Sequence, residues 1–450
     1  MGDWFIIWGP HLIGIAFVAA FGGCVGSFLN VVVYRLPLGM SVINPPSRCC
    51  SCGRRLRAHE NLPVIGWFIS GRRCWSCGCP ISIEYPAIEA IVALLFAAAY
   101  AVEFIVAPHS WLGRGGALWF QTYGFVATAP VAAAIFVLIA SLVAATLTDL
   151  RTFTIPLAIT LTATLVGFAG WTIQGAMATP AMANAWPMPR ANWGGVGLGL
   201  GGILGLAISL GLLGLGTIKR SFADYDTYVK AGETLGDYPH ARREMRHEIV
   251  FLLPIVALAV AGFFLLRSTA SPIPPILQGL SASALGYLAG AGIVWVVRIV
   301  ATLAKGIEAM GMGDVHLLGA AGAVLGWVDP IAAFFIAPFF GLSWVGLSWL
   351  RGRMRGGPTG RELPYGPHLA LAILALILLR PFFLDAGRLL FPGLISGGRS
   401  LHGAISSGQI PHLPDCPEVH RTSEKGLSNE ADMDCWQRCA HDSHDARTWM

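Results

Sequence analysis

Apolar residues gather in long runs that recur along most of the chain, with short polar segments between them. We count ten such runs, near residues 11–33, 86–106, 124–147, 155–172, 195–217, 249–266, 281–302, 315–328, 331–350 and 365–380. Most of them reach or approach the roughly 20 residues that a helix needs to cross a bilayer, whereas the run at 315–328 is short for a full crossing. The pattern predicts an all-α fold, a polytopic membrane bundle of about 8–10 transmembrane helices.

Composition supports the same class. Hydrophobic residues make up 55% of the 450 residues and charged residues only 12%, about half of what a soluble domain carries. Before the first run there is one acid, Asp3, and no Lys or Arg, whereas a secretory signal peptide begins with a basic region. We therefore expect the first run to be a membrane helix with its N-terminus outside.

The positive charges sit on one side of the predicted membrane. With the N-terminus outside, the inner loops are 34–85, 148–154, 218–248, 303–314 and 351–364, and they hold 19 Lys and Arg residues. The outer loops 107–123, 173–194 and 267–280 hold three. Because positive residues accumulate in cytoplasmic loops, this bias predicts that the inner loops face the cytoplasm.

The first inner loop carries two cysteine pairs. Cys49-x-x-Cys52 and Cys74-x-x-Cys77 are separated by 21 residues. Each short spacer lets a tight turn aim two sulfurs at one ion, so two pairs can complete a tetrahedral four-thiolate site. We predict structural zinc there, because four sulfurs leave no open coordination position; four unliganded cysteines are the alternative. Cys50 and Cys79 fall outside the spacing, and the arginines that could help to balance the negative charge are Arg48, Arg54, Arg55, Arg72 and Arg73.

Two aspartates lie at the ends of apolar runs on the predicted cytoplasmic side. Asp149 ends the third run, and Asp314 opens the run at 315–328. Four predicted crossings separate them, so both emerge at the same face. Two carboxylates held close together share a proton and titrate as a unit, which is the arrangement that activates a water molecule. Gly311 and Gly313 fit this reading as small residues that allow a tight turn and a close substrate.

Other readings remain open for these acids. Each Asp could instead cap the helix that follows it. Glu89 and Glu308 are rival acids at the same face, and Glu89 is either an interfacial first-turn acid or a buried functional one. The glycine pattern Gly197-x-Gly199-x-x-Gly202 matches a dinucleotide fingerprint, but it lies inside a membrane run, and we interpret it as helix packing.

Several segments resemble one known family. They are GSFLNVVVYRLP (26–37), the paired cysteine motifs, YPAIEA (85–90), TDLRTFTIP (148–156), EAMGMGDVHLLGAAGAVLGW (308–327) and LPYGPHLALA (363–372). In this order they are similar to the type IV prepilin leader peptidases, which are prepilin peptidases and N-methyltransferases of the GxGD aspartic peptidase class.

The resemblance implies an aspartic endopeptidase of the bacterial inner membrane, with Asp149 and Asp314 as its catalytic pair. It would remove the basic leader of prepilins and pseudopilins on the cytoplasmic side, and so serve type IV pilus assembly or protein secretion. It would also methylate the new N-terminal residue with S-adenosylmethionine; the sequence identifies no binding site for that cofactor. The expected partners are the substrates and the lipid bilayer, with no nucleic acid.

The chain departs from the family pattern in three places. Family members often have Lys where this chain has His316, which would make any tuning of Asp314 depend on pH. The polar loop 218–248 and two additional apolar runs precede the GxGD motif. The tail from Gly397 onward is polar and has no recognisable counterpart.

These features predict a domain organisation along the chain. Its parts are a first transmembrane helix at 11–33, a cytoplasmic zinc-binding loop at 34–85, helices with the first Asp at 86–217, a charged cytoplasmic insertion at 218–248, helices with the GxGD motif at 249–380, and a disordered tail at 397–450. Two other functions stay open: a GxGD intramembrane protease of the presenilin type, and a proton-coupled transporter with a zinc-binding regulatory loop.

Overall fold

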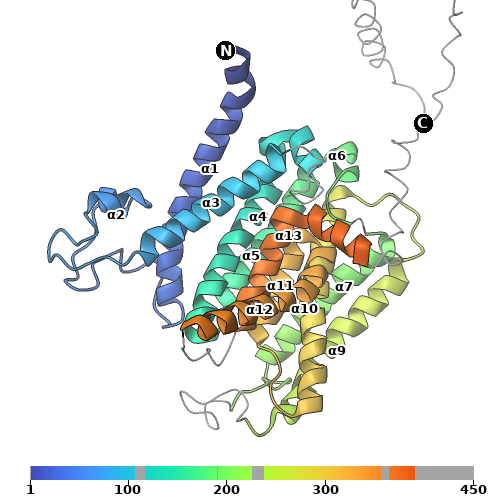
Figure 1. Cartoon of the computed structure of the whole chain (residues 1–450). Helices are drawn as coiled ribbons and strands as arrows, with labels where there is room; N and C mark the ends of the chain where they lie inside the picture. The colour runs from blue at the N-terminus through green and yellow to red at the C-terminus, as the bar shows by residue number, and fades with distance from the viewer. Residues whose placement is uncertain (1, 107–116, 190, 225–237, 356–363, 391–450) are drawn as a thin grey trace, which may run out of the picture. The chain divides into compact units, whose positions relative to one another are not determined.

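The computed structural model describes residues 2–106, 117–189, 191–224, 238–355 and 364–390. The helices, shown in Figure 1, are α1 (Gly2–Arg35), η1 (Ala58–Asn61), α2 (Ile65–Ile69), α3 (Glu84–Phe104), α4 (Ala117–Thr152), α5 (Leu157–Met177), α6 (Pro180–Asn184), α7 (Trp193–Gly214), α9 (Ala241–Leu266), α10 (Pro275–Lys305), α11 (Met312–Leu325), α12 (Val328–Arg355) and α13 (Tyr365–Leu390). Within these ranges the only β-type pairs are two isolated bridges in the cysteine loop. The predicted all-α fold is confirmed.

Nine of the described helices are long and apolar enough to cross a membrane, as expected for a multi-pass membrane protein. The tenth apolar run, at 315–328, corresponds to α11, which has only 14 residues. At 1.5 Å per residue this helix is about 21 Å long, shorter than the roughly 30 Å hydrocarbon core. Treating that run as a full crossing is therefore wrong. Four long helices (α5, α7, α9 and α10) still lie between the two aspartates.

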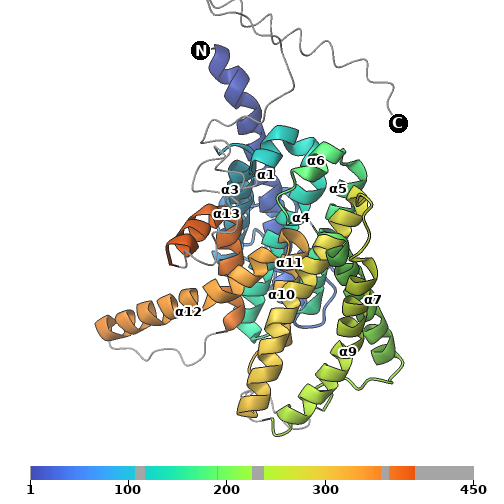
Figure 2. The same cartoon turned by 90° about the vertical axis from the view of Figure 1, so that its right-hand side faces the viewer.

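The short helix α11 is the most buried element of the bundle. It packs against α4, α5, α10, α12 and α13 (Figures 1 and 2). From Leu317 to Leu325 every side chain is at most 2% exposed or belongs to a buried glycine. A helix too short to span the membrane is thus shielded by its neighbours, and its first turn is held in a fixed place.

Glycines let the helices approach closely. Gly286 of α10 and Gly322 of α11 face each other, and a side chain on either would collide with the backbone of the other. Gly197 of α7 and Gly262 of α9 do the same. Small residues at such crossings are the usual basis of helix packing in membranes. The GxGxxG pattern is therefore a packing surface, as interpreted from the sequence.

Two of the predicted segments extend beyond the described residues. The tail at 397–450 lies outside them, and so does the part of the charged insertion between 225 and 237. The described remainder of that insertion leads into α9, whose first residue is Ala241.

Candidate active site and cysteine cluster

Asp149 lies in the last turn of α4 and is only 6% exposed. The C-terminal end of a helix carries partial negative charge, so a carboxylate is unfavourable there. Asp149 also does not cap the following helix, α5, whose N-cap residue is Pro156. The compensating donor comes from another helix: the backbone N–H of Gly366, in the first turn of α13, donates to the Asp149 carboxylate. The free N–H groups of a helix N-terminus suit an anion.

Asp314 lies in the first turn of α11 and is 8% exposed. Its carboxylate accepts a hydrogen bond from the N–H of Gly311, the residue at the N-cap. An acid in the first turn that bonds back to the N-cap N–H is half of a capping box. Asp314 therefore helps to cap α11, as the alternative interpretation of the sequence expected, whereas Asp149 caps no helix.

The two carboxylates lie close enough for their charges to repel each other. The start of α13 lies near both acids: the Gly366 N–H donates to the Asp149 carboxylate, and the Tyr365 side chain is near enough to Asp314 to be influenced by its charge. Ile155, in the short segment between α4 and α5, packs against Gly313. The ends of three helices distant in sequence thus meet beside the two acids.

The rival acids are engaged elsewhere. Glu89 of α3 is buried and accepts hydrogen bonds from the Val64 N–H, at 2.7 Å, and from the Ser27 hydroxyl. Glu308 forms an ion pair with Arg298, with 2.5 Å between Oε1 and Nη1. Neither carboxylate joins the pair formed by Asp149 and Asp314.

The tight turn expected from the two glycines is wrong, whereas the close approach of a substrate stays a prediction. Neither Gly311 nor Gly313 adopts a positive φ, so the backbone conformation does not require glycine at either position. Gly313 is instead limited by space, because a Cβ there would lie 2.8 Å from the Cβ of Ile155. At Gly311 an added Cβ would find only the Asp314 Oδ2 at 3.7 Å, an ordinary contact.

A buried ion cluster holds the segment before α11. Arg298 of α10 is 1% exposed and pairs with Glu248 of α9 at 3.0 Å and with Glu308 at 2.5 Å. The same guanidinium donates to the carbonyl oxygen of Met310, and the Trp295 indole donates to Glu248 at 2.8 Å. The guanidinium thereby fixes the chain one residue before the GxGD turn.

Arg298 is also the cation that acts on Asp314. His316, which the sequence suggested for that role, forms no hydrogen bond or ion pair with Asp314. No pattern in the sequence pointed to Arg298, Tyr365 or Gly366 as residues of this site, although the last two lie within LPYGPHLALA. The available signal was the Pro364-Tyr365-Gly366-Pro367 sequence, which is typical of a helix start.

The four predicted metal ligands come together. The sulfurs of Cys49, Cys52, Cys74 and Cys77 all lie within 4.8 Å of one another, and those of Cys49 and Cys77 are 3.7 Å apart. Cys50 and Cys79 stay outside this cluster. Four thiols at this separation are a suitable donor set for one tetrahedral metal ion.

Both cysteine pairs are built in the same way. Each is followed by a glycine with positive φ, Gly53 at 70° and Gly78 at 68°, a conformation that other residues rarely adopt. In each pair, N–H groups of the second cysteine and of the serine before it point at the first sulfur. They lower the pKa of Cys49 and that of Cys74, the latter to about 6. A lowered pKa favours the thiolate, the form that binds metal.

One arginine of the five proposed from the sequence contacts the cluster directly. Arg54 hydrogen-bonds the Cys74 sulfur and forms an ion pair with Glu60 at 2.6 Å. It thus connects the cluster of four sulfurs to η1.

Comparison with known proteins matches two parts of the chain to sequence profiles. Residues 20–103 match the Bacterial Peptidase A24 N-terminal domain, and residues 243–346 match the Type IV leader peptidase family. The second profile includes the GxGD motif with Asp314. In these two parts the chain is similar to the type IV leader peptidase family. Asp149 lies in neither matched range, and no solved structure matches the chain.

Several curated relatives carry the name Prepilin leader peptidase/N-methyltransferase. The protein of Burkholderia pseudomallei (strain 1026b) is 27% identical over 404 residues, which cover 84% of this chain and 90% of that protein. The Myxococcus xanthus (strain DK1622) protein is 49% identical over 80 residues, and the Dichelobacter nodosus protein is 37% identical over 110. These two alignments span only 24% and 38% of the relatives' own lengths.

Proposed function

We propose that this protein is an aspartic endopeptidase that removes the basic leader from type IV prepilins or pseudopilins at the cytoplasmic face of the inner membrane, and then N-methylates the new terminal residue. The observation that carries the peptidase part is the proximity of Asp149 on α4 and Asp314 on α11, two buried carboxylates that are 165 residues apart in the sequence. The relatives' names support the choice of substrate and the second activity.

The proposed chemistry uses the carboxylates as one unit. Because two negative charges cannot easily coexist in a buried site, the pair holds one proton between them. The ionised member takes a proton from a water molecule, and the resulting hydroxide adds to the scissile carbonyl carbon. The protonated member gives its proton to the carbonyl oxygen. When the tetrahedral intermediate collapses, the C–N bond breaks, the leaving amine takes a proton from the protonated carboxyl group, and a hydroxyl of the intermediate returns a proton to the other carboxylate, so the pair again holds one proton.

The surroundings of the pair support this assignment. The Gly366 N–H holds the Asp149 carboxylate in place, and the ion cluster around Arg298 fixes the approach to Asp314. The excess of Lys and Arg in the inner loops favours the cytoplasm as the side on which both acids lie.

We propose that the cysteine cluster holds zinc in a structural role. A four-thiolate site has no free position for a substrate, and the cytoplasm disfavours a disulfide. Replacing Cys52 with serine should release the metal, whereas replacing Cys50, a neighbour outside the cluster, should not. Metal content measured by mass spectrometry on both purified variants separates the two cases.

Cleavage of a defined substrate tests the peptidase proposal. A peptide with a basic leader and an apolar N-terminal helix is added to the purified protein in lipid nanodiscs, and mass spectrometry locates the cleaved bond. Asp149→Asn and Asp314→Asn should abolish cleavage, and Glu84→Gln, an exposed acid paired with Arg151, should retain it. Cleavage inside the apolar helix would favour the presenilin-type alternative. No cleavage by the unsubstituted protein would favour a transporter.

A further inference from the structure

The predicted charged insertion, residues 218–248, folds back on itself in the parts that the structure describes. The rings of Phe222 and Tyr238 pack together with their centroids 5.1 Å apart, and the Tyr238 hydroxyl donates to Asp224 Oδ1 at 2.7 Å. Tyr238 is only 1% exposed, and Ala241, the first residue of α9, lies in the same small apolar cluster. The insertion therefore has a small core of its own beside the start of α9.

This small core lies against the buried ion cluster. The Phe222 ring covers the guanidinium of Arg298, with 5.3 Å between the Arg298 Cζ and the ring centroid, close enough for a cation–π interaction. Phe222 has a φ of 54°, a backbone conformation that a bulky side chain rarely adopts, and its N–H donates to Glu244 Oε2 at 2.9 Å. Glu248, the last residue of the insertion, pairs with Arg298 at 3.0 Å. The insertion thus supplies both a counter-charge and an aromatic cover for one buried arginine.

A second arginine ties the insertion to the end of α10 (Figures 1 and 2). Arg242, in the first turn of α9, donates from Nε to the carbonyl oxygen of Leu303 at 2.9 Å and from Nη2 to that of Ala304 at 3.1 Å. The last carbonyl groups of a helix have no partner within the helix, and a cation also suits the partial negative charge there. Arg242 therefore holds the last turn of α10 against the start of α9.

The end of α10 in turn holds the segment that leads to the GxGD motif. The Ala309 N–H donates to the Thr302 hydroxyl at 3.2 Å. The Arg298 guanidinium donates to the carbonyl oxygen of Met310, and Asp314 follows in the first turn of α11. A continuous series of contacts therefore runs from the insertion through the end of α10 to one of the two proposed catalytic acids.

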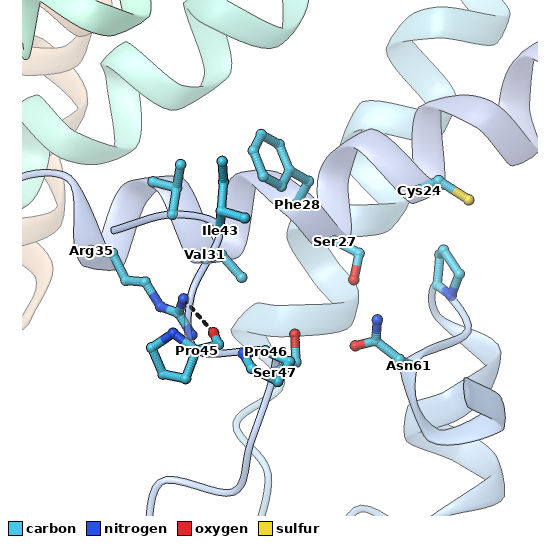
Figure 3. Close-up of a pocket in the computed structure, with 12 residues that line it drawn as sticks. Cys24, Ser27, Phe28, Val31, Arg35, Ile43, Pro45, Pro46, Ser47 and Asn61 are labelled. Carbon is cyan, nitrogen blue, oxygen red and sulfur yellow. Dashed lines mark hydrogen bonds between the residues drawn. The ribbon is translucent and has the colours of Figure 1, made fainter. Parts of the chain in front are cut away.

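Another arginine that holds a loop offers a comparison. Arg35, in the last turn of α1, donates to the carbonyl oxygens of Ser41 and Pro45 beside a cavity of about 260 Å³ (Figure 3). These contacts join groups within ten residues of one another, so they are local. The guanidinium of Arg298 is instead oriented and covered by side chains of the insertion. Its position therefore depends on a segment that can be changed without touching residues 306–314.

We propose that the two described parts of the insertion, 218–224 and 238–248, form a positioning element of the peptidase site. Phe222 and Arg242 act through the end of α10 on the placement of Asp314, so the inference rests on the proposed peptidase function. An aromatic ring over the buried guanidinium keeps water away from it, which strengthens its ion pairs and its bond to the chain before α11. The GxGD segment is thereby held where its acid reaches the other one, and a displacement of about 1 Å there costs roughly 100-fold in rate.

Substitution of Phe222 separates positioning from peptide binding. Phe222→Leu removes the aromatic ring but keeps an apolar side chain, whereas Phe222→Tyr keeps the ring. In the full-length protein in nanodiscs, kcat for cleavage of the prepilin-like peptide should fall about 3- to 30-fold in Phe222→Leu, the range set by the strength of a cation–π contact, and should recover in Phe222→Tyr. KM should stay nearly unchanged, because the ring affects the placement of an acid and not the binding of the peptide.

Phe264→Leu is the matched control. The Phe264 ring centroid lies 4.6 Å from the Arg267 Cζ at the opposite end of α9, so this substitution removes a contact of the same kind away from the site. It should leave kcat unchanged. Equal kcat for Phe222→Leu and the unsubstituted protein overturns the proposal, and so does an equal fall in Phe222→Leu and Phe264→Leu.

Arg242→Ala tests the same element if Phe222→Leu fails to fold. Arg242 is exposed, so its loss leaves no buried charge, but it removes the two bonds to the end of α10. We expect kcat to fall by about 3- to 10-fold, the effect of losing such hydrogen bonds. Arg246→Ala removes an exposed arginine one turn further along α9 and should cleave as the unsubstituted protein does. Equal rates for the two arginine variants overturn the proposal.

Hydrogen exchange tests the positioning without relying on turnover. In the full-length protein, the amides of residues 306–316 should exchange about 3- to 30-fold faster in Phe222→Leu than in Phe264→Leu, because the contacts that hold this segment open more often. Unchanged exchange in Phe222→Leu overturns the proposal. Faster exchange in a protein that cleaves no prepilin-like peptide supports the positioning element, whereas the proposed peptidase function then fails.

Discussion

Replacing Gly366 with alanine should displace the Asp149 carboxylate while leaving the protein folded. A Cβ at this position would lie 2.5 Å from Asp149 Oδ2, closer than real Cβ atoms approach any neighbour. The atom in the way is the end of a side chain that can rotate, so the overlap is relieved by moving the carboxylate and costs little stability. The N–H of residue 366 remains, but its acceptor is pushed away from it.

The size of the effect follows from the overlap. Ordinary contact begins at 3.4 Å, so the carboxylate must move by about 0.9 Å. A misplacement of about 1 Å at a reacting group costs roughly 100-fold in rate. We therefore expect kcat for leader cleavage to fall by about two orders of magnitude, equivalent to about 2.7 kcal/mol of lost transition-state stabilisation.

Gly311→Ala is the matched control. This glycine also lies beside one of the two aspartates, but its added Cβ would be 3.7 Å from Asp314 Oδ2, at an unstrained φ of −71°. It should cleave the prepilin-like peptide nearly as fast as the unsubstituted protein. Initial rates at saturating peptide, with melting temperatures measured in parallel, distinguish the two variants. Equal rates for Gly366→Ala and Gly311→Ala would refute the reasoning.

Three further changes test other parts of the molecule. Arg298→Met leaves Glu248 buried without its cation, which should lower the free energy of unfolding by about 3–5 kcal/mol and show as a large fall in melting temperature; an unchanged melting temperature contradicts the ion cluster. Cys52→Ser should lose one metal ion per chain and make the cysteine loop sensitive to protease, while Cys50→Ser keeps both properties; equal metal content would count against the site. His316→Lys replaces an imidazole with an amine of different intrinsic basicity, so the pH–rate profile for cleavage should change; superimposable profiles discard a role for His316.

The cysteine cluster could be predicted from the sequence almost completely. Its geometry depends on two local turns, and Cys-x-x-Cys followed by glycine specifies each of them. Counting the helices between Asp149 and Asp314 could predict that both acids lie at the same face of the membrane, but not that they lie close together. The run at 315–328 was wrongly counted as a crossing, but it follows Asp314 in the sequence. The number of crossings between Asp149 and Asp314 is therefore unaffected.

The groups that position the acids could not be predicted in the same way. The N–H of Gly366 reaches Asp149 only because α13 begins beside the end of α4, and nothing local to either segment specifies that contact. Glu248 and Arg298 are 50 residues apart on α9 and α10, and their pairing depends on how those helices pack. The sequence motif includes Gly313, but the need for a small residue there comes from the neighbouring side chain of Ile155, which only the three-dimensional structure shows.

The central claim is that Asp149 and Asp314 together hydrolyse a peptide bond. Its most direct test is single-turnover cleavage of a prepilin-like peptide by Asp149→Asn, Asp314→Asn and Glu84→Gln, each shown to be folded by its melting temperature. We expect no detectable cleavage by either Asp variant and normal cleavage by the Glu84 variant. Substantial cleavage by a folded protein lacking either carboxylate would contradict it.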